Sequence, residues 1–286
     1  MQVHIFGDTG GQLPALHSGL TVAGLNQHAL PEDVMILHLG DLVHRGPYSS
    51  LAVSFVDKIM QTNPGRWVQI MGNHEAMHLG HSKFFKCNCD DEAISTLQKW
   101  YEDGILVPAA ALTSISPRKW TGGNRPIHQE EAVSDILAVH GGLTYNFWRD
   151  KLGSPESASE TARAINELPQ RVLFKSGIVL DGWPANHRAG PVWAAAAEEV
   201  FPSWDRITPP FSQAVGHTTP FSFWTNSWRR GLSKKFRKSA KGVPAEKRAV
   251  AFFEEAEALL MMDPGFGKER EEIQPFLTVE AAEAKF

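Results

Sequence analysis

Five short apolar runs of this chain are each followed by a residue that can bind a metal ion. Such runs are typical of buried strands, and ligand sites of α/β proteins lie at the carboxyl ends of strands, where the loops converge. The runs and the residues that follow them are 3–6 before Asp8, 34–39 before Asp41, 68–71 before Asn73 and His74, 136–139 before His140, and 214–215 before His217. We therefore expect these side chains to share one crevice, where the carboxylates, carboxamide and imidazoles would suit a hard-to-borderline divalent metal.

The strand-like runs alternate with helical stretches, which predicts βαβ units and a sheet covered by helices. The helices are expected at residues 14–23, 51–60, 92–101 and 159–168, the second of them capped by Ser49 or Ser50. Because no internal repeat and no linker is visible, we expect a single domain over residues 1–286. Insertions are expected near 114–131 and 145–189, with a basic insertion at 229–248.

Composition limits the function classes. The chain has 286 residues, of which 42% are hydrophobic, enough for a core, and a net charge of −4 that favours neither nucleic acid nor an anionic membrane. The only cysteines are Cys87 and Cys89, too close to bridge easily, which fits a reducing cytoplasm. No apolar run approaches the length of a membrane span, and a strand that begins at Val3 leaves no room for a signal peptide.

The segment 229–248 holds nine Lys and Arg residues against the single acid Glu246. It lies between the His217 loop and the expected final strand at 258–262, so we expect it to overhang one side of the crevice. Charge runs are most often solvated loops, and that is the first interpretation. The second is a collar that attracts an anionic substrate or partner. Nucleic-acid binding is the least favoured, because only Trp228 and Phe236 could stack on bases there.

Six motifs in order carry a resemblance to a known family. They are residues 7–12 (GDTGGQ), 40–46 (GDLVHRG), 72–75 (GNHE), 140–143 (HGGL), 190–193 (GPVW) and 216–218 (GHT). Together they resemble the motifs of calcineurin-like metallophosphoesterases of the phosphoprotein-phosphatase branch, and most of all the bacterial Shewanella-like protein phosphatases. The similarity extends from Val3 to Gly267. It implies an α/β fold, a four-layer sandwich of two mixed β-sheets flanked by helices.

The resemblance also implies two metal ions bridged by Asp41. One of them would be held by Asp41, Asn73, His140 and His217, most simply manganese, with zinc or iron as alternatives. The other would be held by Asp8 and Asp41 alone, because Gly10 stands where the family has a histidine. We therefore predict that this second site is weak.

Other histidines are poor replacements for the missing ligand. His4 shares the strand face of Asp8 but lies too far back along the strand. His78 or His81, just beyond the third motif, could in principle reach the site, although a histidine beside a motif is more often incidental.

The same resemblance assigns catalytic roles. Arg45 would bind phosphate oxygens, and His74 would protonate the leaving oxygen. His44 stands where the family has an aspartate that pairs with this acid, so we expect His74 to lose its proton more easily.

A further departure is Ala195, which stands where relatives carry a substrate-binding arginine. Arg188 could substitute for it or be an ordinary surface residue.

Two function classes follow. The first is a metal-dependent phosphoesterase (a hydrolase) that uses metal-activated water on a phosphomonoester, either a phosphoprotein, possibly with phosphotyrosine, or a small-molecule phosphate. The second is a degenerate metallophosphoesterase that acts as a binding module with little or no turnover. The retained residues favour the enzyme, and they are Asp8, Asp41, Arg45, Asn73, His74, His140 and His217. The departures Gly10, His44 and Ala195 favour the binding module.

Overall fold

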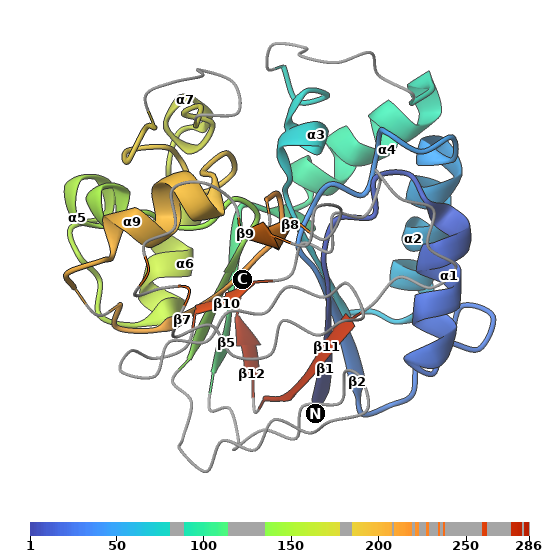
Figure 1. Ribbon diagram of the computed structural model, residues 1–286. Coiled ribbons are helices and arrows are strands. Elements are labelled where there is room, and N and C mark those ends of the chain that lie inside the picture. Colours follow the sequence, from blue (N-terminus) through green and yellow to red (C-terminus); the bar gives the residue numbers. More distant parts are fainter. Residues whose placement is uncertain are drawn as a thin grey trace.

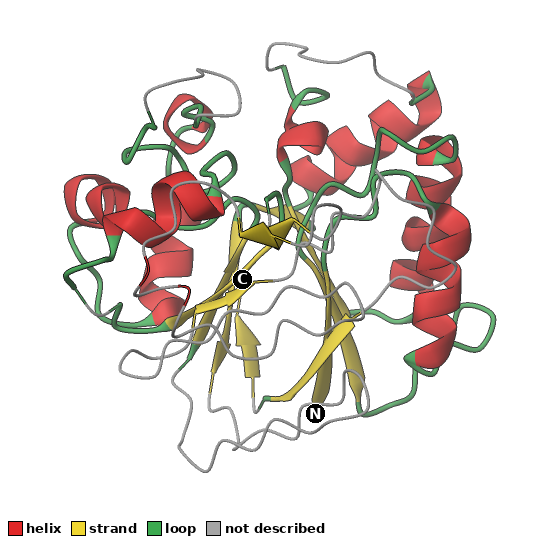
Figure 2. Ribbon diagram, viewed as in Figure 1, coloured by secondary structure: helices red, strands yellow, loops and turns green. Residues whose placement is uncertain are grey.

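Two five-stranded sheets form the centre of the protein in the computed structural model (Figures 1 and 2). The structure describes residues 1–80, 89–113, 135–177, 185–207, 209–218, 221–222, 227–228, 234, 237, 259–261, 276–281 and 283–285. The first sheet has the order β11-β1-β2-β3-β4, and the second has the order β10-β7-β6-β5-β12.

Both sheets are mixed. In the first, β1 (Gln2–Phe6), β2 (Val34–His38), β3 (Trp67–Ile70) and β4 (Leu106–Val107) run parallel, and β11 (Phe276–Glu280) is antiparallel to β1. In the second, β6 (Ile136–Val139), β7 (Ser212–Val215) and β10 (Leu259–Met261) run parallel, while β5 (Ala109–Thr113) is antiparallel to β6 and to β12 (Glu283–Lys285). A separate antiparallel pair joins β8 (Phe221–Ser222) and β9 (Ser227–Trp228).

Helices cover the outer faces of the two sheets, which gives four layers (Figure 1). Beside the first sheet lie α1 (Leu13–Val22), α2 (Ser49–Thr62), the single turn α3 (Asn73–Ala76) and α4 (Asp91–Glu102). Beside the second lie α5 (Tyr145–Leu152), α6 (Ala158–Asn166), α7 (Gln170–Leu173), the π-helical turn η1 (Ala196–Val200) and α9 (Phe201–Ser203).

The strands are apolar on both faces because the inner faces pack against the other sheet and the outer faces pack against helices. Ile5, Leu37 and Ile70 of the first sheet pack in one buried cluster with Leu112 and Ile136 of the second. Each such side chain contributes about 1.5–3 kcal/mol when it is fully buried. The outer faces of β1, β2, β3, β6 and β7 pack against the helices, and the residues of these five strands are buried apart from Gln2.

The predicted sandwich is confirmed, and the four predicted helices correspond to α1, α2, α4 and α6. The predicted cap of α2 is wrong. Tyr48 occupies the N-cap position without a side-chain bond, because Ser49 Oγ accepts the His44 N–H and Ser50 Oγ accepts the Asp90 N–H. Both hydroxyls join neighbouring loops to the helix instead of capping it.

The expected final strand is present as β10, but it is not the last, since β11 and β12 follow it and close one edge of each sheet. Of the expected insertions, 145–189 contains α5, α6 and α7. The segment 114–131 lies outside the described residues, as does 229–248 apart from the exposed Lys234 and Arg237. The single domain stays a prediction. Within the described ranges, no helix has the length and apolarity that crossing a bilayer requires.

Candidate metal centre

The five predicted strand endings meet at one edge of the two sheets. Phe6 is paired with His38 in parallel register, His38 with Gln69, and Val139 with Val215, so the loops that follow these strands leave at the same level. The loops approach each other closely. A side chain on Gly40 (φ 97°) would lie 2.7 Å from the Gly72 nitrogen and from His140 Nδ1. Glycine is therefore required where these loops cross.

Three of the predicted ligands form a compact group. One ligating atom from each of Asp41, His140 and His217 lies within 4.8 Å of the others, and all three residues are buried. Asn73 completes the group, because its Oδ1 lies 3.0 Å from His140 Nε2 and 2.9 Å from His217 Nδ1. The structure thus brings together the four residues that the sequence placed at one metal.

Hydrogen bonds outside the group orient its members. His140 Nδ1 donates to the Leu39 carbonyl at 2.7 Å, which directs Nε2 toward Asn73 and toward Asp41 Oδ1 at 3.3 Å. Asp41 Oδ1 also accepts the His74 N–H at 3.0 Å. A backbone carbonyl that fixes a ring in this way is the usual support of a ligating histidine.

The charges of the group are strongly coupled. Burial alone would raise the pKa of Asp41, but the imidazolium field of His140, joined by that of His74, holds it well below its usual value. Although burial lowers the pKa of His140, the Asp41 and Asp8 carboxylates raise it to about 10. Burial and the charge of His140 lower the pKa of His217 to about 3. In this charge state the carboxylate and the His217 ring are ready to bind a cation, and His140 carries the proton that a cation would displace.

The residues fit a divalent metal ion. Asp41 Oδ2 and His217 Nε2 are buried, and neither makes a hydrogen bond within the part of the chain that the structure describes. Buried polar atoms of this kind are normally paired, so a missing partner is indicated. One carboxylate, one carboxamide oxygen and two imidazole nitrogens suit manganese, zinc or iron.

Asp8 lies at the margin of this group. Its Oδ1 accepts the His217 N–H at 3.0 Å and lies 3.9 Å from His140 Nδ1, but it is not a member of the compact group found among the described residues. Gly10 (φ 56°) donates its N–H to the Asp41 carbonyl at 2.7 Å and brings no side chain. The asymmetry expected of the two metal sites is consistent with this arrangement and stays a prediction.

His74 lies beside the Asp41 carboxylate oxygen that His140 does not contact. Its Nε2 lies 3.6 Å from Asp41 Oδ2, and its Nδ1 lies 3.1 Å from His44 Nδ1. Burial lowers the pKa of His74, and the charge of Arg45 lowers it further against the opposing field of Asp41. Arg45 is exposed, with a φ of 61°, and its positive charge contributes to lowering the pKa of both His74 and His217.

The remaining candidates take other partners. His4 Nδ1 lies 2.8 Å from Thr278 Oγ1 on β11, as its position far back on the strand predicted. Arg188 is exposed and its Nε lies 3.4 Å from Asp150 Oδ2 on α5, while Ala195 is buried. The substrate-binding role of Arg188 stays a prediction, and its contact with Asp150 is that of a surface ion pair.

One residue that sequence reasoning missed is Glu75. Its buried carboxylate accepts the N–H groups of Asp41, Leu42 and Gly72 at 2.8, 2.8 and 2.9 Å. It therefore joins the second motif to the third and fixes the backbone of Asp41. The signal was its place at the end of the Gly-Asn-His-Glu motif, where only the preceding two residues had been given a role.

Comparisons with known proteins agree with this geometry. Residues 1–200 match the family model described as calcineurin-like phosphoesterase. A serine/threonine-protein phosphatase of Caenorhabditis elegans is 25% identical over 191 residues, which is 66% of this chain and 37% of that protein. The chain thus spans little more than a third of the length of this curated relative.

Solved structures share the fold. A cold-active protein-tyrosine phosphatase of a psychrophilic Shewanella species aligns over 97% of this chain and 74% of its own, with a TM-score of 0.56 and 13% identity. A mutant of a cold-active protein tyrosine phosphatase aligns over the same shares, with a TM-score of 0.52 and 14% identity. At such low identity these similarities establish the architecture.

Proposed function

Because this chain belongs to the calcineurin-like phosphoesterase family, we propose that it is a metal-dependent phosphoesterase that hydrolyses a phosphomonoester. The observation that carries the proposal is the buried convergence of Asp41, His140 and His217 around the Asn73 carboxamide, with two ligand atoms left without a hydrogen bond among the described residues. A carboxylate, a carboxamide oxygen and two imidazoles suit a divalent cation. Members of the family use such a metal ion for phosphoryl transfer.

Asp41, Asn73, His140 and His217 would hold the metal ion, for which manganese is proposed and zinc or iron are the alternatives. When bound, such an ion acidifies a water molecule toward neutral pH and polarises the phosphoryl group. The Leu39 carbonyl keeps the His140 ring turned toward the ion. The Asp8 carboxylate accepts the backbone N–H of His217 and so helps to position that residue. A second metal ion, bridged by Asp41, would gain only the Asp8 carboxylate as a further ligand and would bind more weakly.

Two cationic or protonated groups would act on the substrate. Arg45, an exposed residue of the loop that contains Asp41, would bind two phosphate oxygens at once with its planar fork. His74 would donate a proton from Nε2 to the leaving oxygen, a role worth about 10²–10⁴-fold in rate. Since burial and Arg45 lower the pKa of His74, the protonated acid would be scarce at neutral pH, and activity should be greatest on the acidic side.

The substrate class is proposed from chemistry and from the relatives. Their names indicate phosphoserine or phosphothreonine in one case and phosphotyrosine in the other. We propose a phosphorylated protein, possibly a phosphotyrosine protein, or a small-molecule phosphate as the substrate. The cysteine content and the lack of a long apolar run favour action in the cytoplasm.

A colorimetric assay with p-nitrophenyl phosphate tests the proposal. Wild-type protein with added manganese should release p-nitrophenol, His140→Ala should lose at least about a hundredfold in rate, and the exposed His17→Ala should match the wild type. A wild-type rate no greater than that of His140→Ala would reject catalysis. If the wild-type protein were inactive in this way but still bound phosphate, the second candidate, a binding module, would be established. The departures at Gly10, His44 and Ala195 favour that candidate.

A further inference from the structure

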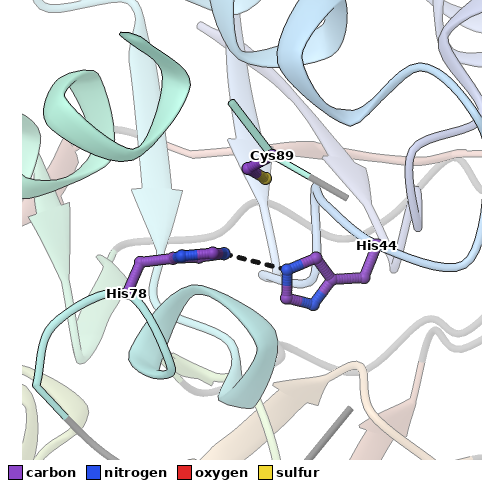
Figure 3. Close-up of side chains that lie close together, drawn as sticks. All are labelled: His44, His78 and Cys89. Carbon is purple, nitrogen blue, oxygen red and sulfur yellow. Dashed lines mark hydrogen bonds between the residues drawn. The ribbon is translucent and has the colours of Figure 1, made fainter. Parts of the chain in front are cut away.

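A second cluster of side chains that could bind a metal lies next to His74 and is separate from the group of Asp41, His140 and His217. Among the described residues, one ligating atom from each of His44, His78 and Cys89 lies within 4.8 Å of the others. The three side chains come from three different segments (Figure 3): the loop between β2 and α2, the turn after α3, and the residues just before α4. Neither the resemblance nor the proposed reaction assigns them a metal.

We propose that His44, His78 and Cys89 form a zinc site of their own, with a fourth position left for water or another ligand. Thiolate and imidazole together select zinc over manganese, magnesium or calcium. Three protein ligands with one open position are a common zinc arrangement. The site is independent of the proposed function, because zinc binding here requires no turnover.

The geometry is close to what zinc requires. His44 Nε2 and His78 Nε2 face each other at 2.9 Å, and the rings are inclined by 63° (Figure 3). Two imidazole nitrogens on one tetrahedral zinc lie about 3.3 Å apart, given bonds of about 2.0 Å. A displacement of a few tenths of an ångström, together with a turn of the rings that directs both lone pairs to one point, would therefore admit the ion.

The backbone around the site is well fixed, which lowers the entropy lost on binding. The His44 N–H is held by Ser49 Oγ at 2.8 Å, and the His78 carbonyl accepts a bond from Gln98 on α4 at 3.0 Å. Asp90, next to Cys89, caps α4 and donates its backbone N–H to Ser50 Oγ, so both ends of the cluster are tied to helices. Burial and the neighbouring His74 lower the pKa of His44 to about 3, so its ring stays neutral, which is the form that binds a metal.

The site would control the acid of the proposed reaction, a consequence that, unlike the site itself, rests on the role of His74. Zinc on His44 Nε2 leaves the ring proton on Nδ1, 3.1 Å from His74 Nδ1. To accept from it, His74 Nδ1 must give up its bond to the Val43 backbone carbonyl, which puts the proton of a neutral His74 on Nε2, the atom that faces Asp41. Because the protonated acid carries a hydrogen on both nitrogens and its Nδ1–H would face the His44 N–H, zinc would hold His74 neutral and so restrain the acid of the proposed reaction.

Cobalt substitution tests the site directly. Chelator-stripped protein is titrated with cobalt, whose bond to a thiolate gives a charge-transfer absorption in the near ultraviolet. The band should appear in the wild type and in His140→Ala, which removes a ligand of the other centre. It should disappear in Cys89→Ser and weaken in His78→Ala, while His17→Ala serves as the histidine control. Far-ultraviolet circular dichroism checks that each variant is folded.

A second measurement uses zinc alone. One equivalent of zinc should protect Cys89 from alkylation by iodoacetamide at least about tenfold, as read by mass spectrometry of the peptide, because a zinc-bound thiolate is a poorer nucleophile. Equal alkylation with and without zinc, or a cobalt band that survives Cys89→Ser, would overturn the proposal.

The tautomer of His74 is read separately, by long-range ¹⁵N–¹H spectroscopy of the zinc-bound protein. A proton on Nε2 supports the coupling to His74. A proton on Nδ1 overturns the coupling while leaving the zinc site in place, so the two parts of the inference fail independently.

Discussion

His44 Nδ1 lies 3.1 Å from His74 Nδ1, so an imidazole occupies the position from which a carboxylate would stabilise the protonated form of His74. Because neither ring is negatively charged, the contact can orient His74 but cannot raise its pKa. Burial and the charge of Arg45 lower the pKa of His74, and His44 brings no negative charge that would offset them.

Replacing His44 by aspartate should reverse this effect. An opposite charge at this distance raises the pKa of a neighbouring imidazole by about 1–3 units, so the pH above which activity falls should move up by about one unit or more. The matched control is His44→Asn, which is polar but uncharged and should leave the profile in place. Identical pH–rate profiles for the aspartate and asparagine variants would show that His74 is not the acid.

Metal uptake should release a proton. In the metal-free protein the carboxylates of Asp41 and Asp8 overcome the effect of burial and raise the pKa of His140 to about 10, against an ordinary value of 6.5. That shift stabilises the metal-free fold fully below pH 6.5, and the contribution is lost as the pH rises through about 10. At pH 7.5 His140 is therefore protonated, and the metal must displace its proton.

Titration with manganese in buffers of different ionisation enthalpy counts that proton. About one proton per bound ion is expected, and the apparent affinity should rise about tenfold per pH unit below pH 10. His217→Ala, which keeps His140, should still release the proton while binding more weakly. Binding with no proton release would contradict the charge state described for His140.

Gly10→His should strengthen the weak second site and increase turnover. The φ of 56° at Gly10 disfavours a side chain by about 1–2 kcal/mol, but His44 and His217 already adopt φ values of 70° and 63° in the same site. Gly10→Ala is the control that carries the backbone strain without the ligand. If the histidine variant bound no more metal than the alanine variant, Gly10 would be required for the conformation of the turn, and the result would support the binding module over the enzyme.

Glu75→Gln should destabilise the site without touching a metal ligand. The carboxylate accepts N–H groups from both loops, and a glutamine of the same shape turns an NH₂ group toward one of them. An unsatisfied buried donor costs about 1–3 kcal/mol, so the free energy of unfolding should fall by that amount and manganese should bind less tightly. Glu156→Gln, the same change at an exposed position between α5 and α6, is the control. Unchanged stability in Glu75→Gln would mean that these bonds do not hold the Asp41 loop.

The sequence was sufficient for the fold, through the family resemblance, and for the proximity of the four proposed ligands, because proximity depends on periodic apolar runs and on the residue that follows each run. Asp41, Asn73, His140 and His217 follow strands whose parallel register brings their loops to one level, so spacing along the chain translates into proximity. The sandwich followed from the order of the motifs.

Features that depend on contacts between distant loops could not be read in this way. Ser49 and Ser50 had the residue type and position of helix caps, yet their hydroxyls bind the backbone of other loops. Glu75 stands at the end of the third motif, but that place does not show that its carboxylate binds the backbone of Asp41 and Leu42, more than thirty residues away. Nothing in the local pattern marks Cys89. His78 was noticed only as a possible replacement for a missing ligand, whereas the structure pairs it with His44.

Anomalous diffraction from crystals grown with manganese, recorded near the manganese absorption edge, tests the central claim most directly. The account predicts one strong peak bounded by Asp41, Asn73, His140 and His217, with a weaker peak or none beside Asp8, and no peak at the same position in His140→Ala. Two equal peaks in the wild type would contradict the asymmetry of the site, and the absence of a peak among those four residues would contradict the metal centre itself.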